Sequence, residues 1–179
     1  VNSLYGYDYS EFPAVSTGDA SGSMIPGDVT MTILGTTSTS ESWYTAVTSD
    51  LYYADGSLGT LVIPSIGLNV KVFEGTGDTS LKNGVGHFEE TSIWKGNVAL
   101  GGHNRGVNTY FGKIDKLKSG AEITLTTQLG SRTYKVTGVE KISSTNTSVL
   151  DSTAENCITL LTCVRDQPDF RWYVRGVAV

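Results

Sequence analysis

The chain has 179 residues, of which 39% are hydrophobic and 17% are charged. This length predicts one domain with or without an appendage, and the composition excludes wholesale disorder. With 13 Lys and Arg against 18 Asp and Glu the net charge is −5, which argues against nucleic acid or an anionic membrane surface as the main partner.

The charge is divided unevenly along the chain. Residues 1–70 contain no Lys or Arg and carry a charge of −7, so residues 71–179 carry +2. An asymmetry of this kind is typical of two parts with different roles. We therefore expect an acidic, Ser/Thr-rich N-terminal arm or spacer over residues 1–57 and a catalytic or binding domain over residues 58–179.

Within the arm, the sequence predicts a short strand over Val29–Leu34 and a helix over Ser42–Tyr53, started by a serine cap. Two interpretations of the arm stay open. It is either a spacer that lies along the surface or a lid that reaches an active site.

From Gly59 onward the pattern changes to short apolar or alternating segments bounded by Gly, Asn or Asp, which predict strands. These segments are Thr60–Pro64, Asn69–Glu74, Asn97–Leu100, Ala121–Thr127, Arg132–Lys141, Asn156–Cys163 and Phe170–Val179. Seven or eight such strands predict a closed or nearly closed β-barrel. Apolar residues at helical spacing also predict a short helix over Thr109–Lys118.

The two cysteines lie in one predicted strand. Cys163 lies six positions after Cys157, so their Cα atoms lie roughly 20 Å apart in a strand, beyond the roughly 7 Å that a disulfide spans. The same distance excludes a shared metal ion. Cys157 is predicted to be a packed thiol, whereas Cys163 ends its strand beside a predicted loop over residues 164–169 and is accessible enough to be a nucleophile.

A thiol with an ordinary pKa of about 8.5 needs a nearby cation and an oxyanion donor to act in acyl transfer. If the last two strands form a hairpin, Arg171 lies opposite Cys163. Arg175 falls roughly 13 Å further along the strand, near Thr159, and is predicted to be solvated. Arg171 is therefore the preferred partner of the thiol.

Two histidines are available as a general acid or base. His103 follows a predicted strand in the segment Gly-Gly-His-Asn, and His87 stands between a glycine and an aromatic residue. Either one alone is more typical of a surface or loop position. Beside the candidate Cys163 and Arg171, His103 is the better choice.

The segment Thr159–Cys163, with Arg171 eight positions later and Gly-Gly-His-Asn sixty residues earlier, resembles the sortases of Gram-positive bacteria. Leu61–Gly67, Gly84–Phe88 and Asn97–Leu100 also resemble segments of that family. The resemblance runs from about Gly59 to Val179. It implies a mainly β fold: a closed eight-stranded barrel with one or two short helices.

The resemblance also implies a function. Sortases are extracellular cysteine transpeptidases that cleave an LPxTG-like sorting signal between Thr and Gly through a thioacyl enzyme and pass the acyl group to an amine. By matching position, Cys163 is the nucleophile, His103 the general acid/base and Arg171 the oxyanion donor, while Thr162 helps to shape the substrate site. No cofactor or metal is implied, and membrane contact is expected only through an anchor upstream of this chain.

The acceptor amine belongs to peptidoglycan or to a pilin lysine. No Asp-Pro-aromatic tripeptide, the lid motif of pilus-type sortases, occurs in the sequence, which favours an anchoring member such as class D. The alternatives that stay open are a pilin-polymerising sortase, a thiol hydrolase of the same fold and a non-catalytic surface binding module.

Overall fold

The computed structural model describes residues 31–33, 36–38 and 42–179. Strand β1 (Met31–Ile33) pairs antiparallel with β2 (Thr36–Ser38). The expected strand over Val29–Leu34 is thus present in part, and its remaining residues lie outside the described ones. Residues 1–30 of the arm also lie outside them.

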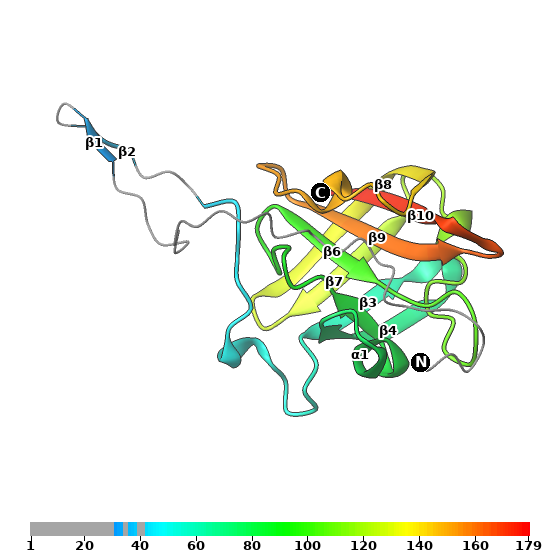
Figure 1. The fold of residues 1–179 in the computed structure, drawn as a ribbon. Helices are drawn as coiled ribbons and strands as arrows, with labels where there is room; N and C mark the ends of the chain where they lie inside the picture. Colours follow the sequence, from blue (N-terminus) through cyan, green and yellow to red (C-terminus); the bar gives the residue numbers. More distant parts are fainter. Residues whose placement is uncertain (1–30, 34–35, 39–41) are drawn as a thin grey trace.

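Eight strands close into a barrel in the order β10-β8-β7-β3-β4-β5-β6-β9, as the fold expected from the sequence requires (Figure 1). Their bounds are β3 Gly59–Ile63, β4 Leu68–Glu74, β5 Val85–His87, β6 Asn97–Gly101, β7 Glu122–Thr127, β8 Gly130–Ser143, β9 Cys157–Val164 and β10 Gln167–Ala178. Neighbouring strands are antiparallel except for β4 with β5 and β6 with β9. The seven predicted strands are all present, and the short β5 is the eighth.

The barrel interior is filled by alternate residues of its strands. In β7, Ile123 and Leu125 point inward and are buried, whereas the residues between them are more exposed. Strand β9 is buried along both faces: Leu160 belongs to the interior cluster, and Leu161 belongs to a second cluster that also contains Leu81, Phe88 and Leu150. The face of β9 that bears the odd-numbered residues is therefore the outer face of the barrel, covered in part by other segments.

The helix expected over Thr109–Lys118 is wrong: only a 3₁₀ turn, η4 (Ile114–Lys116), forms there. The apolar residues Phe111, Ile114 and Leu117 are all buried in the barrel core. They recur every three residues, which is the period of a 3₁₀ turn, and hydrogen bonds such as Ile114 N to Phe111 O at 3.3 Å have that spacing. The chain thus buries its apolar positions without an α-helix.

The helix expected over Ser42–Tyr53 is also wrong, since this segment is extended apart from the 3₁₀ turn η2 (Ser49–Leu51). Its backbone bonds to the barrel instead of to itself: Ile93 N donates to Thr45 O at 3.0 Å, and Thr45 N donates to Ser92 Oγ at 2.9 Å. Leu51 packs with Leu58 and Ile93. Tertiary contacts have replaced the hydrogen bonds of a helix.

The α-helix that does form, α1 (Asp78–Asn83), was not predicted from the sequence. It is six residues long and buries a single residue, Leu81, so no helical periodicity reveals it. Two further 3₁₀ turns, η3 (Pro64–Ile66) and η5 (Ser148–Leu150), complete the described elements. None of the helices in the described part of the chain is both long and apolar enough to cross a membrane.

Candidate active site

The hairpin of β9 and β10 places Arg171 directly opposite Cys163, as the strand register predicted from the sequence requires. Arg175 lies opposite Thr159 in the same ladder, also as predicted. The connection differs from the expected loop over residues 164–169, because β9 continues through Val164 and β10 begins at Gln167. Asp166, with a φ of 60°, makes this tight turn, and a register irregularity before Arg171 absorbs the difference.

The parallel pairing of β6 with β9 brings the loop that carries His103 to the end of β9 that contains Cys163. Gly101 is the Cα partner of Leu161, and Gly102 N donates to Leu161 O at 3.2 Å. His103 follows Gly101 by two residues, as Cys163 follows Leu161, and Asn104 Nδ2 donates to Cys163 O. Cys163 and Arg171 therefore come from adjacent strands, and His103 lies in the loop that directly follows β6, the other neighbour of β9. Neighbouring strands lie roughly 4.8 Å apart.

Cys163 and Arg171 belong to the outer face of the barrel. Side chains alternate along β9, so Cys163 lies on the same face as Leu161. Leu161 packs in the second hydrophobic cluster, with Leu81 and Phe88, and not in the barrel interior. Arg171, as the partner of Cys163 across the ladder, lies on that same face. Cys163 is partly exposed, in contrast to the buried Cys157, and neither cysteine forms a disulfide, as expected from the sequence.

Arg171 is buried, with 2% of its surface exposed. Its Nη1 donates to Pro168 O at 2.6 Å and to Phe170 O at 2.9 Å. These two bonds fix the guanidinium against the turn that follows Cys163.

His103 has a pKa below its usual value because burial disfavours the charged imidazolium. The negative charge of Asp78, on α1, opposes this shift in part. Lys82 O, near the end of the same helix, accepts a hydrogen bond from Asn108 Nδ2 at 2.6 Å. Helix α1 thus contributes a negative charge near His103 and a hydrogen bond to a residue five positions further along the chain.

Arg175 corrects the expectation of a solvated residue. Its side chain is half-buried, with Nη1 donating to Cys157 Sγ at 2.8 Å and Nε donating to Tyr173 Oη at 2.8 Å. The packing of Cys157, 1% exposed, agrees with the prediction of an inert thiol. Because Arg175 lies opposite Thr159, this arrangement is separate from the row that contains Cys163.

Two more residues surround the thiol's backbone. Thr162 is buried, and its Oγ1 donates to Gly102 O at 2.7 Å. Asn104 Nδ2 donates to Cys163 O, and Asn104 O accepts from Arg165 Nη2 at 2.9 Å. No role was predicted for Asn104 or Arg165 from the sequence. Their positions, directly after His103 and two residues after Cys163, are the sequence feature that could have indicated them.

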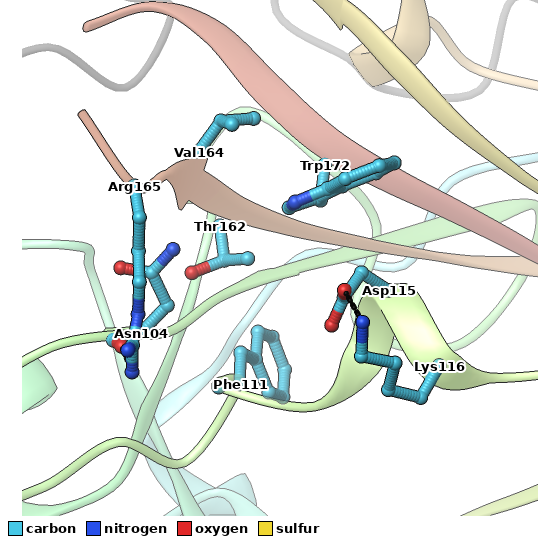
Figure 2. A pocket seen from close by; sticks show the side chains of 9 residues that line it. Asn104, Phe111, Asp115, Lys116, Thr162, Val164, Arg165 and Trp172 are labelled. Carbon is cyan, nitrogen blue, oxygen red and sulfur yellow. Dashed lines mark hydrogen bonds and ion pairs between the residues drawn. The ribbon is translucent and has the colours of Figure 1, made fainter. Parts of the chain in front are cut away.

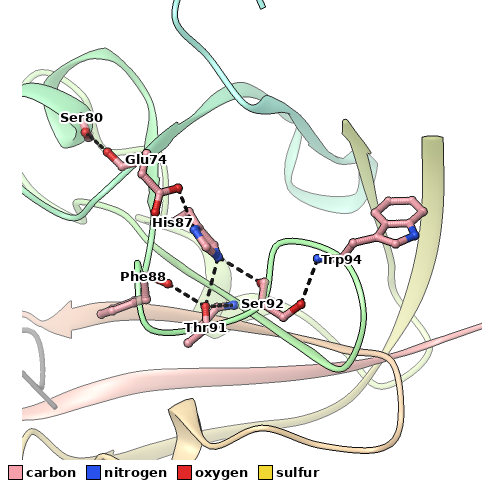
Figure 3. Close-up of polar contacts among 8 residues, drawn as sticks. Glu74, Ser80, His87, Phe88, Thr91, Ser92 and Trp94 are labelled. Carbon is pink, nitrogen blue, oxygen red and sulfur yellow. Dashed lines mark hydrogen bonds and ion pairs between the residues drawn. The ribbon is translucent and has the colours of Figure 1, made fainter. Parts of the chain in front are cut away.

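His87, which the sequence ranked below His103, is fully buried and lies among polar groups of its own neighbourhood (Figure 3). Its Nδ1 lies 2.9 Å from Glu74 Oε2, and its Nε2 lies 3.0 Å from Ser92 O and 3.2 Å from Thr91 Oγ1. These contacts join β4, β5 and the following loop. They describe a structural histidine.

A family comparison identifies the barrel. The family model for the sortase domain matches residues 61–179. The chain belongs to the sortase family. That match covers the three candidate residues and every barrel strand except the beginning of β3, in agreement with the resemblance found in the sequence.

Sequence relatives include two proteins named Sortase A. One, from Listeria monocytogenes, is 37% identical over 119 residues, which cover 65% of this chain and 53% of the relative. The other, from Bacillus anthracis, is 33% identical over 121 residues, which cover 65% of this chain and 57% of the relative. The chain thus spans about half the length of the curated relatives it matches.

Solved structures of sortases share the fold. The Group B Streptococcus Pilus Island 1 Sortase C2 matches with a TM-score of 0.66 and 28% identity, covering 71% of this chain and 76% of that one. Sortase C-1 from Actinomyces oris matches with a TM-score of 0.66 and 26% identity, covering 70% and 75%. The closed barrel of this sortase domain is therefore the sortase fold.

A pocket of about 310 Å³ lies beside the end of β9 in this sortase domain (Figure 2). Thr162, Val164 and Trp172 line it together with the ion pair of Asp115 and Lys116, whose charged atoms are 2.9 Å apart. Thr162 and Val164 face the opposite side of β9 from Cys163, so this pocket is not where the thiol points. Among the described residues, no group of three or more His, Cys, Asp or Glu side chains is placed to hold a metal ion.

Proposed function

We propose that this sortase domain is a cysteine transpeptidase that cleaves an LPxTG-like sorting signal between Thr and Gly and transfers the acyl group to an amine. The observation that carries the proposal is the pairing of Cys163 with Arg171 across β9 and β10, beside the loop after β6 that carries His103. A nucleophile, a proton carrier and a cation within a few ångströms of one carbonyl are the groups that acyl transfer requires.

In the first half-reaction Cys163 Sγ attacks the carbonyl carbon of the Thr–Gly bond. The carbonyl oxygen becomes an oxyanion, which the buried guanidinium of Arg171 stabilises. His103 takes the thiol proton of Cys163 as the sulfur attacks and gives it to the leaving amine as the C–N bond breaks, so the products are a thioacyl enzyme and a free peptide amine.

In the second half-reaction an amine attacks the thioester. His103 takes the proton of the amine, the C–S bond breaks, and the sulfur leaves as the thiolate or thiol of Cys163. The partial burial of His103 lowers its pKa and so favours the neutral imidazole that accepts this proton.

Two candidate roles share this chemistry and differ only in the amine that accepts the acyl group. The sequence relatives named Sortase A support an anchoring role, with a peptidoglycan amine as the acceptor. The structural neighbours titled as pilus sortases support a pilin-polymerising role, with a pilin lysine as the acceptor. Supplying each type of amine to a preformed acyl enzyme separates the two.

The test uses an LPxTG peptide with and without triglycine. We expect a ligated product whose formation Cys163→Ala abolishes. Cleavage that added amine does not alter contradicts transfer and indicates a thiol hydrolase. Failure to form an acyl enzyme with any peptide of a sorting-signal library indicates a binding module.

We also propose that the domain works at the outer surface of the membrane, held by an upstream anchor, and that residues 1–57 serve as a spacer for the barrel of residues 58–179. Contacts of Thr45 and Leu51 with the barrel support docking of the last part of this arm. Removal of residues 1–41 is expected to leave peptide turnover unchanged; a rise in turnover would identify the arm as a lid.

A further inference from the structure

We propose that Thr162, Asn104 and Arg165 form a ladder of side-chain hydrogen bonds that positions His103 against Cys163. The proposal deepens the proposed function and rests on it. Thr162 and Asn104 are positioning residues in this account, since they bond to the backbone around the reacting residues.

The backbone ladder of β6 and β9 ends just before the catalytic row. Gly102 N donates to Leu161 O, just beyond the last paired residues of the two strands. In a parallel ladder the bonds alternate between the strands. A continuation would therefore use the carbonyls of Gly102, Cys163 and Asn104 in turn, with backbone amides of the opposite strand as donors.

Those same three carbonyls accept hydrogen bonds from side chains. Gly102 O accepts from Thr162 Oγ1 at 2.7 Å, Cys163 O accepts from Asn104 Nδ2, and Asn104 O accepts from Arg165 Nη2 at 2.9 Å. The acceptors keep the order of a parallel ladder, and the donors alternate between the two chain segments in the same way. These side-chain bonds therefore continue the register of β6 and β9 beyond their last backbone hydrogen bond, as far as Cys163.

The donors reach further at each step. A threonine hydroxyl sits on Cβ, an asparagine amide nitrogen is attached to Cγ, and an arginine Nη is attached to Cζ. Longer arms at successive positions hold two segments that diverge, whereas backbone amides hold strands at roughly 4.8 Å. The ladder thus keeps His103 and Cys163 in register while the segments separate, which leaves room between them for a substrate carbonyl and its leaving amine.

Burial and a nearby ion pair support the same geometry. Thr162 and Asn104 are 1% and 7% exposed, so water does not compete for their hydrogen bonds. Arg105 Nη2 and Asp166 Oδ1 are 2.7 Å apart and join the same two segments one step further out. Because a misplacement of about 1 Å can cost 10²-fold in rate, losing a rung is expected to affect the chemical step.

The test compares Asn104→Leu, which keeps the size of the side chain but removes the donor, with Asn104→Gln, which keeps an amide. We expect Asn104→Leu to lower kcat by about tenfold or more with KM within about twofold, and Asn104→Gln to recover part of the loss. Asn108→Leu is the matched control, since Asn108 lies in the same loop but donates to Lys82 O of α1. Its kcat is expected within about twofold of the parent.

A second measurement does not depend on transpeptidation. The rate of Cys163 alkylation by iodoacetamide, followed against pH, reports the charge beside the thiol. We expect Asn104→Leu to shift this profile because His103 moves relative to Cys163, and Asn108→Leu to leave it in place. The two proposals can fail separately. If Asn104→Leu shifts the alkylation profile but the unsubstituted protein is inactive on every sorting peptide, the proposed function is refuted and the hydrogen-bond ladder is supported.

Two results would overturn the ladder: an unchanged kcat and alkylation profile for Asn104→Leu, or a raised KM with an unchanged kcat. Circular dichroism and the melting temperature show whether the variant is folded. If it is not, Arg165→Met at an exposed position tests the outermost rung, with an expected loss in kcat of about threefold to tenfold. An unchanged kcat in that variant would equally contradict the proposal.

Discussion

The two arginines of β10 allow a sharp test of the catalytic row. Arg171 lies opposite Cys163 and Arg175 lies opposite Thr159, four residues further along, which is roughly 13 Å. Arg171→Ala is expected to slow acyl-enzyme formation by about 10²- to 10³-fold, or about 2.7–4 kcal/mol in activation free energy, as for the loss of one oxyanion donor. Arg175→Ala is expected to leave the rate within about threefold, because a group that far from the carbonyl cannot bond to the oxyanion.

The two variants should resemble each other in stability. Each substitution removes hydrogen bonds of a guanidinium, among them those to Pro168 O and Phe170 O for Arg171 and those to Cys157 Sγ and Tyr173 Oη for Arg175. For hydrogen bonds of this kind we expect a loss of about 1–3 kcal/mol in the free energy of unfolding, which lowers the melting temperature by roughly 2–4 °C per kcal/mol in a domain of this size. If the two variants differ in the rate of acyl-enzyme formation but not in stability, the rate loss in Arg171→Ala is due to catalysis and not to folding.

The assay is single-turnover formation of the acyl enzyme from an LPxTG peptide, followed by mass spectrometry. Arg171→Lys serves as a further control, because it retains the charge but not the planar fork of the guanidinium. Equal rate losses in Arg171→Ala and Arg175→Ala would refute the assignment of the oxyanion donor to Arg171.

Three further predictions concern the surroundings of the row. Asp78→Asn should lower the pKa of His103 further, since it removes the charge that opposes the effect of burial; an NMR titration of the imidazole that shows no decrease would contradict this. Iodoacetamide should label Cys163 in the native protein and Cys157 only after unfolding, because Cys157 is 1% exposed; rapid double labelling under native conditions would disprove the packing. Gly102→Ala places a methyl group 2.8 Å from a phenylalanine ring carbon and should lower the free energy of unfolding in denaturant by about 1–3 kcal/mol. An unchanged unfolding midpoint would contradict this prediction.

The hairpin of β9 and β10 shows how far the sequence can be interpreted alone. An alternating or apolar run bounded by breakers predicts a strand, and counting residues across the predicted hairpin places Arg171 opposite Cys163, where the structure has it. That prediction is correct although the predicted loop is too long, because a register irregularity compensates for the shorter turn.

The failed helices show the limit of the same method. Phe111, Ile114 and Leu117 have apolar spacing that suits both an α-helix and a run of 3₁₀ turns, and only contact with the barrel core selects between them. Around Thr45, hydrogen bonds to residues nearly fifty positions away replace those of the expected helix. Local propensity is a weak determinant where such long-range bonds are available.

The amino-acid sequence by itself determined the chemical groups and most of the strands, because the alternation of apolar residues and the spacing of Cys163 and Arg171 are local properties of the chain. Only the tertiary structure decided that the loop of His103 follows a strand paired with β9, that Arg175 bonds to Cys157 and Tyr173, and that Asn104 bonds to the carbonyl of Cys163. These contacts join segments far apart in the sequence. They depend on how the barrel closes, which no pattern of neighbouring residues records.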